Sequence, residues 1–215
     1  MIIDNLIENV FQEAVNRLGL EETIIDSIII IGIILIYMYV TYNFIKASYR
    51  REKKKKEVKS IVETGSMSFF FFIIAIVVNL KIGVYPFHNV YVNVICIIVY
   101  LLGLATNLLG RYYLGNNWGN NVVIYKDQTL IQNGVYKIVR HPLYASIIWM
   151  IYAIGLLKSN YLVLILNTLI FIPFMTYRAK QEEIELEKVF KEYQYYKKNT
   201  GMFFPNIIKW IRKGK

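Results

Sequence analysis

The chain has 215 residues, of which 56% are hydrophobic and 19% charged, and its formal net charge is +10. This composition, with charges gathered between long uncharged runs, excludes an ordinary soluble domain and predicts an all-α integral membrane protein. Because the basic residues flank the hydrophobic runs, we expect them to orient membrane helices and do not expect nucleic acid as a partner.

Residues 1–22 open the chain with apolar side chains at helical spacing and an acidic opposite face. This pattern predicts an amphipathic helix that lies at the membrane surface or packs against the other helices.

Five uncharged apolar runs follow, at residues 27–45, 67–80, 90–109, 143–157 and 161–177. A membrane crossing needs about 20 residues, so the second and fourth runs are short and would need little tilt, a thinner bilayer or shielding by neighbouring helices. We predict about five transmembrane helices, three of them within residues 23–109 and two forming a helical hairpin over residues 142–177.

The charge distribution predicts the orientation of these helices. The loop at residues 46–59 carries eight Lys or Arg against two Glu, and residues 178–215 carry ten against five. The positive-inside rule places both segments in the cytoplasm, and five crossings then leave the N-terminus outside. The high content of Ile, Lys and Asn is typical of an AT-rich genome, so we expect a bacterial cell membrane.

Cysteine and histidine are too sparse for several kinds of site. Cys96 is the only cysteine, so an intrachain disulfide is excluded. His88 and His141 are the only histidines and lie far apart in the sequence, so we expect no metal site.

The C-terminal half begins with a polar stretch, residues 110–139, whose Gly and Asn content predicts a long and functional loop. After residue 177 the pattern becomes helical and charged, so we expect the last span to continue into the cytoplasm, with a kink at Pro173. Residues 206–215 predict an interfacial basic tail anchored by Trp210.

Two groups of polar residues could support chemistry. Arg140 and His141 precede Pro142, which favours the first turn of a helix, so both would lie at the mouth of the fourth span. Arg178 and Glu182 are four residues apart and share one face of a helix. Taken separately, these residues could be interfacial anchors and a surface ion pair. The short hairpin turn at residues 158–160, however, predicts that the two groups meet at one membrane level, which indicates a functional site.

Five elements occur in a recognisable order: Asp127-Gln128-Thr129-Leu130-Ile131-x-x-Gly134-Val135-Tyr136, then Arg140-His141-Pro142-x-Tyr144, Arg178-x-x-x-Glu182-Glu183-x-x-Leu186, Phe190-x-x-Tyr193-x-x-Tyr196 and Pro205. Over residues 104–205 the chain thereby resembles the isoprenylcysteine carboxyl methyltransferase family, within the wider group of small membrane methyltransferases that includes phospholipid methyltransferases.

The resemblance implies S-adenosylmethionine as the methyl donor, in a pocket that a C-terminal cytoplasmic helical segment completes within residues 110–205. It further implies that Arg178 meets the acceptor. The residues implied to bind the cofactor are Gln128, Leu130, Ile131, Tyr136, His141, Pro142, Leu143, Tyr144 and Glu182. Gln128 stands where the eukaryotic members have histidine.

The expected reaction is carboxyl methylation of a lipidic or lipid-linked, isoprenylcysteine-like acceptor. A carboxylate is already ionised at neutral pH and needs only orientation, which Arg178 can supply by a bidentate hydrogen bond. Three alternatives stay open: a phospholipid or amine N-methyltransferase with Glu183 as the general base, an NADPH-dependent enzyme related to sterol reductases, and a non-enzymatic membrane subunit.

Overall fold

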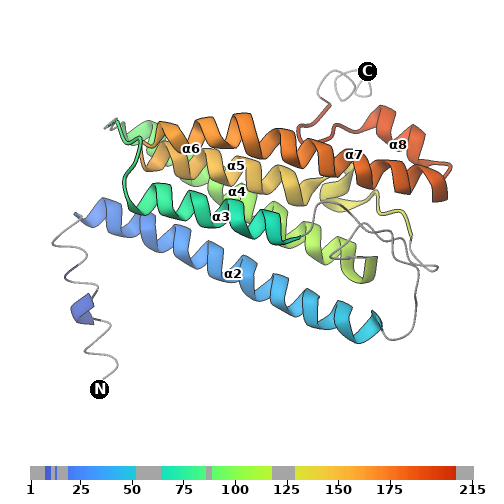
Figure 1. The fold of residues 1–215 in the computed structure, drawn as a ribbon, viewed down its shortest axis with the longest axis horizontal. Coiled ribbons are helices and arrows are strands. Elements are labelled where there is room, and N and C mark those ends of the chain that lie inside the picture. Colours follow the sequence, from blue (N-terminus) through green and yellow to red (C-terminus); the bar gives the residue numbers. More distant parts are fainter. Residues whose placement is uncertain are drawn as a thin grey trace.

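A computed structural model describes residues 8–10, 13, 19–51, 64–85, 89–117 and 129–206. Most of the predicted N-terminal helix, most of the loop at residues 46–59 and all but one residue of the predicted tail lie outside these ranges. Within them the regular secondary structure is helical (Figure 1). The elements are α2 (Leu20–Arg51), α3 (Thr64–Asn79), α4 (Val90–Leu114), η1 (Gly115–Asn117), η2 (Gly134–Lys137), α5 (Pro142–Leu157), α6 (Tyr161–Leu166), η3 (Asn167–Phe171), α7 (Ile172–Val189) and α8 (Tyr193–Asn199).

All five predicted apolar runs form helices, and the chain is an integral membrane protein. Within the described part of the chain, three helices are long and apolar enough to span a membrane, at Leu20–Lys46, Val90–Leu114 and Tyr161–Val189. The two short runs give the shorter apolar helices Phe70–Asn79 and Pro142–Leu157.

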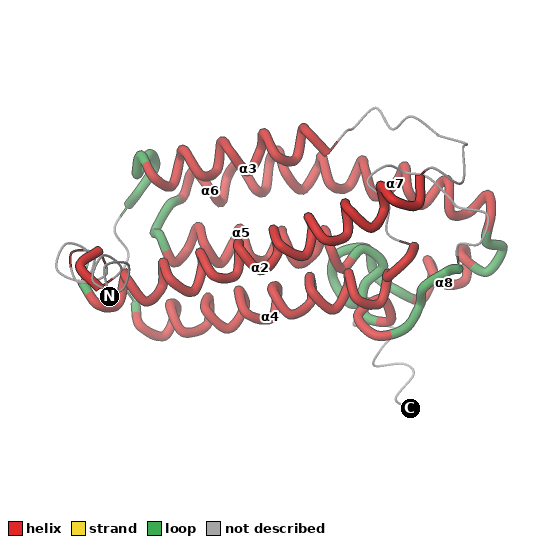
Figure 2. Tube along the Cα trace, turned by 90° about the horizontal axis from the view of Figure 1, so that it is seen from below, coloured by secondary structure: helices red, strands yellow, loops and turns green. Residues whose placement is uncertain are grey.

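Helices α4 and α5 pack along each other through small residues on α4. A Cβ atom added to Gly103 would lie 2.6 Å from Met150 Cγ, and one added to Gly110 would lie 3.0 Å from Leu143 Cδ2. Two glycines one heptad apart therefore let the helices approach closely, as is common in membrane helix pairs. Figure 2 shows α3 and α6 running together on the other side of the bundle.

The last membrane helix is continuous from α6 through η3 into α7, as the sequence predicted. The irregularity expected at Pro173 takes the form of the π-helical segment η3 immediately before it. Proline has no N–H, and its ring clashes with the carbonyl four residues earlier, so a widened turn accommodates it. The start of the predicted loop at residue 110 was wrong, because α4 continues to Leu114.

The bundle has two distinct ends. At one end, residues 80–85 pair with residues 158–161: Tyr85 N–H donates to Ser159 O at 3.0 Å, and Tyr161 N–H donates to Gly83 O at 3.1 Å. At the other end lie η2, the start of α5, the last turns of α7, and α8 (Figure 1). We call the latter the site end and the former the opposite end.

Candidate active site

Backbone hydrogen bonds hold the segment Val139–His141 in place at the site end. Arg140 N–H donates to Gly201 O at 2.8 Å, and His141 N–H donates to Met202 O at 3.1 Å. Pro142 then begins α5 at the position the sequence predicted. The chain after α8 therefore lies against the mouth of α5 and fixes the two residues that precede it.

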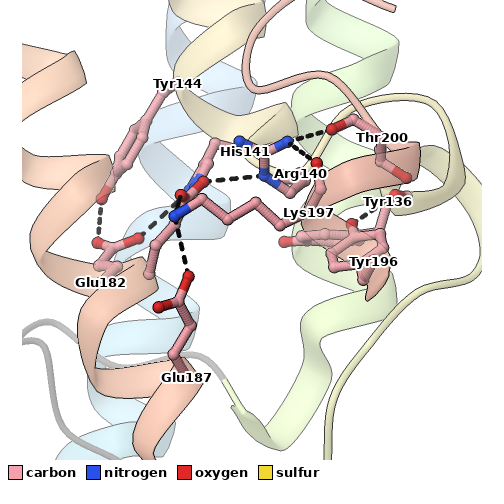
Figure 3. Close-up of polar contacts among 10 residues, drawn as sticks. Tyr136, Arg140, His141, Tyr144, Glu182, Glu187, Tyr196, Lys197 and Thr200 are labelled. Carbon is pink, nitrogen blue, oxygen red and sulfur yellow. Dashed lines mark hydrogen bonds and ion pairs between the residues drawn. The ribbon is translucent and has the colours of Figure 1, made fainter. Parts of the chain in front are cut away.

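Glu183 is the centre of a buried charged cluster, and Figure 3 labels its partners Arg140, His141 and Lys197. Its side chain is 1% exposed, and its Oε1 lies 2.9 Å from Arg140 Nε and 3.1 Å from His141 Nε2. Its Oε2 lies 3.0 Å from Lys197 Nζ. Arg140 also donates to the carbonyl oxygen atoms of Lys197 and Thr200. One carboxylate thus joins α7, α8 and the mouth of α5.

Glu182 is the neighbour of Glu183 but has a different environment. It is 27% exposed, and it accepts a hydrogen bond from the Tyr144 hydroxyl (Figure 3). Arg178 Nε donates to the same hydroxyl at 2.9 Å and lies 3.6 Å from Glu182 Oε1. The predicted pair Arg178–Glu182 is confirmed, as is its convergence with the mouth of α5.

His141 links the two carboxylates. Its Nδ1 lies 3.5 Å from Glu182 Oε2, and its Nε2 lies 3.1 Å from Glu183 Oε1. Burial alone would lower the pKa of His141, but the hydrogen bonds and negative charges of Glu182 and Glu183 raise it above its usual value. The two carboxylates therefore favour the protonated imidazolium form, which can donate from both ring nitrogens.

This charge state predicts a pH-dependent contribution of His141 to stability. A group whose pKa is raised on folding stabilises the fold fully below its unfolded pKa of about 6.5 and loses that contribution as pH rises through the folded pKa. We expect the melting temperature of the unsubstituted protein to exceed that of His141→Gln most at about pH 6, with the difference shrinking as the pH rises through the folded-state pKa. Thermal unfolding in detergent measures this. A constant difference across that range would contradict it.

A cavity of about 1640 Å³ opens beside this cluster. Arg178 and most of the residues expected to bind cofactor line it, namely Leu130, Ile131, Tyr136, His141, Pro142, Leu143, Tyr144 and Glu182. Gln128 lies outside the described residues. Glu183 is enclosed by its three cationic partners and does not line the cavity.

Arg111 also lines this cavity, and the sequence analysis missed it. It is 7% exposed, its Nε donates to Asn107 Oδ1 at 2.9 Å, and Asn107 Nδ2 donates to Ser146 Oγ at 2.8 Å. Its Nη1 is buried and has no hydrogen-bond partner among the residues that the structure describes. A buried guanidinium with an unused donor beside a cavity is suited to bind an anion. The sequence did contain an indication of this role, because Arg111 stands at the end of an apolar run and an ionisable residue in such a place is a functional candidate.

Part of this sequence is similar to known methyltransferases. The model of the isoprenylcysteine carboxyl methyltransferase (ICMT) family matches residues 94–188. A methanethiol S-methyltransferase of Pseudomonas deceptionensis is 36% identical over 74 residues, which are 34% of this chain and 27% of that protein's length. The match thus spans about a quarter of that relative.

The fold is also similar to a solved structure of a eukaryotic intramembrane Ras methyltransferase, an isoprenylcysteine carboxyl methyltransferase. The TM-score is 0.55 at 18% identity, and the superposition covers 96% of this chain and 87% of that one. At this identity the likeness shows a common fold.

Proposed function

We propose that this chain, whose residues 94–188 belong to the isoprenylcysteine carboxyl methyltransferase family, is a membrane methyltransferase that uses S-adenosylmethionine to methylate the anionic end of a lipidic or lipid-linked acceptor. The observation that carries the proposal is one cavity lined by the cluster His141–Tyr144–Glu182 and by two buried arginines, Arg111 and Arg178.

The residues around the cavity fit the methyl donor. When bound, S-adenosylmethionine supplies an electrophilic methyl group on a positively charged sulfur. Glu182 is partly exposed to the cavity and can accept hydrogen bonds from an ammonium or hydroxyl group. The rings of Tyr136 and Tyr144 can face a cation, and Leu130 and Ile131 add apolar walls for an adenine ring.

The two arginines suit an anionic acceptor. Arg178 is held by Tyr144 and Glu182, and Arg111 is held by Asn107, so both guanidinium groups are oriented before a ligand arrives. Bidentate hydrogen bonds from such groups orient a carboxylate and exclude water from it. Because a carboxylate needs no deprotonation at neutral pH, positioning supplies most of the catalysis.

An amine acceptor is less compatible with the same geometry. Two buried guanidinium groups would repel an ammonium ion, and Glu183 is bound to three cations away from the cavity. We therefore propose that Glu183 positions Arg140 and His141 instead of serving as the base that amine methylation would need. A thiolate, the acceptor that the name of the Pseudomonas relative indicates, is also an anion. The size of the cavity favours a larger acceptor than methanethiol.

The proposal places the site end in the cytoplasm, where the donor is made. The basic segments at residues 46–59 and 178–215 support this orientation through the positive-inside rule. The acceptor then reaches the cavity from the bilayer and the donor reaches it from water.

Binding of the donor product tests the proposal. We expect S-adenosylhomocysteine to raise the melting temperature of the purified protein, whereas NADPH leaves it unchanged. Glu182→Gln should weaken S-adenosylhomocysteine binding by about 10- to 100-fold, because a hydrogen bond to a charged group contributes about 1.5–3 kcal/mol. Isothermal titration measures the affinity of the unsubstituted protein and of Glu182→Gln for S-adenosylhomocysteine. Glu192→Gln, at an exposed residue before α8, is the matched control and should bind normally.

Each alternative gives a different result. Stabilisation by NADPH in place of S-adenosylhomocysteine would indicate a reductase, and absence of binding to either would indicate a non-enzymatic subunit. With radiolabelled S-adenosylmethionine and membranes, base-labile label in lipid or protein supports a carboxyl ester. Base-stable label would indicate an amine acceptor.

A further inference from the structure

The cavity is much longer than the charged cluster at its site end. Its volume of about 1640 Å³ exceeds the range of about 300–1,000 Å³ that is typical of small-molecule pockets. From Arg178 at the site end its lining continues between α2 and α5 to Asp26 and Lys158 near the opposite end. The methyl donor therefore fills only part of the cavity, and the proposed function leaves the remainder to the acceptor.

One face of α5 forms a wall of this cavity. Its lining residues recur at spacings of three and four, which places them on a single side of the helix. One row of them, from the site end to the opposite end, is Tyr144, Ile147, Ile151, Ile154 and the C-cap residue Lys158, and Leu143, Met150 and Leu157 line the cavity beside this row. The wall is thus polar at both ends and apolar between them.

Helix α2 forms a second wall with the same periodicity. One row of its lining residues, from the opposite end towards the site end, is Asp26, Ile29, Ile33, Ile36 and Val40, and the lining continues beyond Asp26 to Glu21 and Glu22. The charged residues of α2 that line the cavity, Glu21, Glu22 and Asp26, all stand at the end where the α5 wall also becomes charged. Both walls therefore change from apolar to ionic at one end of the cavity.

An ion pair joins the two walls at that level. Asp26 Oδ1 and Lys158 Nζ are in direct contact, and both residues line the cavity. Hydrogen bonds from α4 hold this end of α2 in position. Tyr100 Oη donates to Ile29 O at 2.8 Å, and Asn93 Nδ2 donates to Glu21 Oε1 at 2.9 Å. An apolar chain that extends along the cavity from the site end meets this ion pair.

We infer that the Asp26–Lys158 ion pair sets the maximum length of the apolar chain that the acceptor carries, an inference that rests on the proposed function. Each methylene buried between the isoleucine walls should improve affinity about fourfold. A methylene at the level of the ion pair would displace water from two charges and gain no such burial.

The helix geometry gives the expected length. Lys158 follows Tyr144 by 14 residues, which is about 21 Å along α5. An extended chain advances about 1.2 Å per bond, judging from the span of about 3.3–3.6 Å for the three backbone bonds of a residue. The cavity should therefore accept about 17 chain atoms beyond the level of Tyr144.

Equilibrium binding of a chain-length series tests the inference. The probes are alkylthioacetates with decyl, tetradecyl, octadecyl and docosyl chains, added to the full chain in nanodiscs saturated with S-adenosylhomocysteine. We expect the affinity to rise steeply from decyl to tetradecyl and to stay level from octadecyl to docosyl. In the double variant Asp26→Leu/Lys158→Leu the affinity should continue to rise. For each probe, the ratio of the affinity of the double variant to that of the unsubstituted protein cancels the partition of the probe into the bilayer.

Two further variants control for folding and position. The exchanged pair Asp26→Lys/Lys158→Asp restores the ion pair and should restore the plateau. Tyr91→Leu changes a highly exposed residue of α4 that does not line the cavity, and it should leave the plateau where it is. A series with no plateau, a plateau that the leucine variant does not move, or no binding at any length would overturn the inference. Methyl transfer to the same probes reports on the proposed function separately.

Discussion

Arg178→Leu should lower kcat/KM for a carboxylate acceptor by about 100-fold or more while leaving the affinity for S-adenosylhomocysteine nearly unchanged. A bidentate guanidinium–carboxylate pair makes two charge-assisted hydrogen bonds, and each contributes about 1.5–3 kcal/mol. The substitution leaves Tyr144 hydrogen bonded to Glu182, so the part of the site assigned to the donor keeps its internal contacts. The loss should therefore appear in the acceptor reaction.

Initial rates with radiolabelled donor, together with titration of S-adenosylhomocysteine, separate these two effects. Arg178→Lys keeps the charge but loses the planar pair of donors, so its rate should lie between those of the unsubstituted protein and Arg178→Leu. Lys180→Leu, at an exposed residue of the same helix, should leave both quantities unchanged. Equal losses of donor affinity and rate in Arg178→Leu would place this residue on the donor side of the site.

Glu183→Gln should lower the free energy of unfolding by about 3–5 kcal/mol. Removing one partner of a buried ion pair leaves the other charge uncompensated, and this typically costs that amount. Here the substitution leaves three cationic groups, on Arg140, His141 and Lys197, around a neutral amide. We expect the variant to lose its ordered site end as well as stability.

Glu187→Gln provides the matched comparison for this prediction. Glu187 also pairs with Lys197, at 2.9 Å, but its side chain is 30% exposed and that of its partner 42%. Exposed ion pairs contribute about 0–1 kcal/mol, so this variant should unfold almost like the unsubstituted protein. Thermal and denaturant unfolding in the same detergent measure both. Similar losses in the two variants would show that the burial of Glu183 does not determine its effect.

Local sequence patterns were sufficient to predict the helices and one pair of the site. Uncharged runs located the membrane helices, and proline at position 142 located the start of α5. The spacing of Arg178 and Glu182 follows from helix geometry alone. A turn of three residues between α5 and α6 then predicted that this pair meets His141, because the apolar runs on either side of the turn are similar in length and antiparallel packing brings their far ends together.

Other features of the site depend on tertiary contacts that no local pattern encodes. Glu182 and Glu183 are adjacent, and successive side chains on a helix point about 100° apart, so one faces the cavity and the other the interior. The sequence does not distinguish them, and the partners of Glu183 come from α8 and the mouth of α5. Arg111 was assigned to a loop because the polar composition from residue 110 onwards concealed the last turn of α4.

The π-helical segment η3 has a consequence for how the last membrane helix tolerates change. A π-helical turn holds one residue more than an α-helical turn, so the helix beyond Phe171 is displaced in phase by about 100° relative to a regular continuation of α6. The face that carries Arg178 and Glu182 points into the cavity only because of this displacement. Point substitutions preserve the phase, and removal of one residue from η3 would let this turn become α-helical with the phase unchanged. One residue added to or lost from a regular α-helical turn, by contrast, would rotate the reactive face by about 100°. Length, more than composition, is therefore the constrained property of the regular turns of α6, and η3 is the place where a change of one residue can be absorbed.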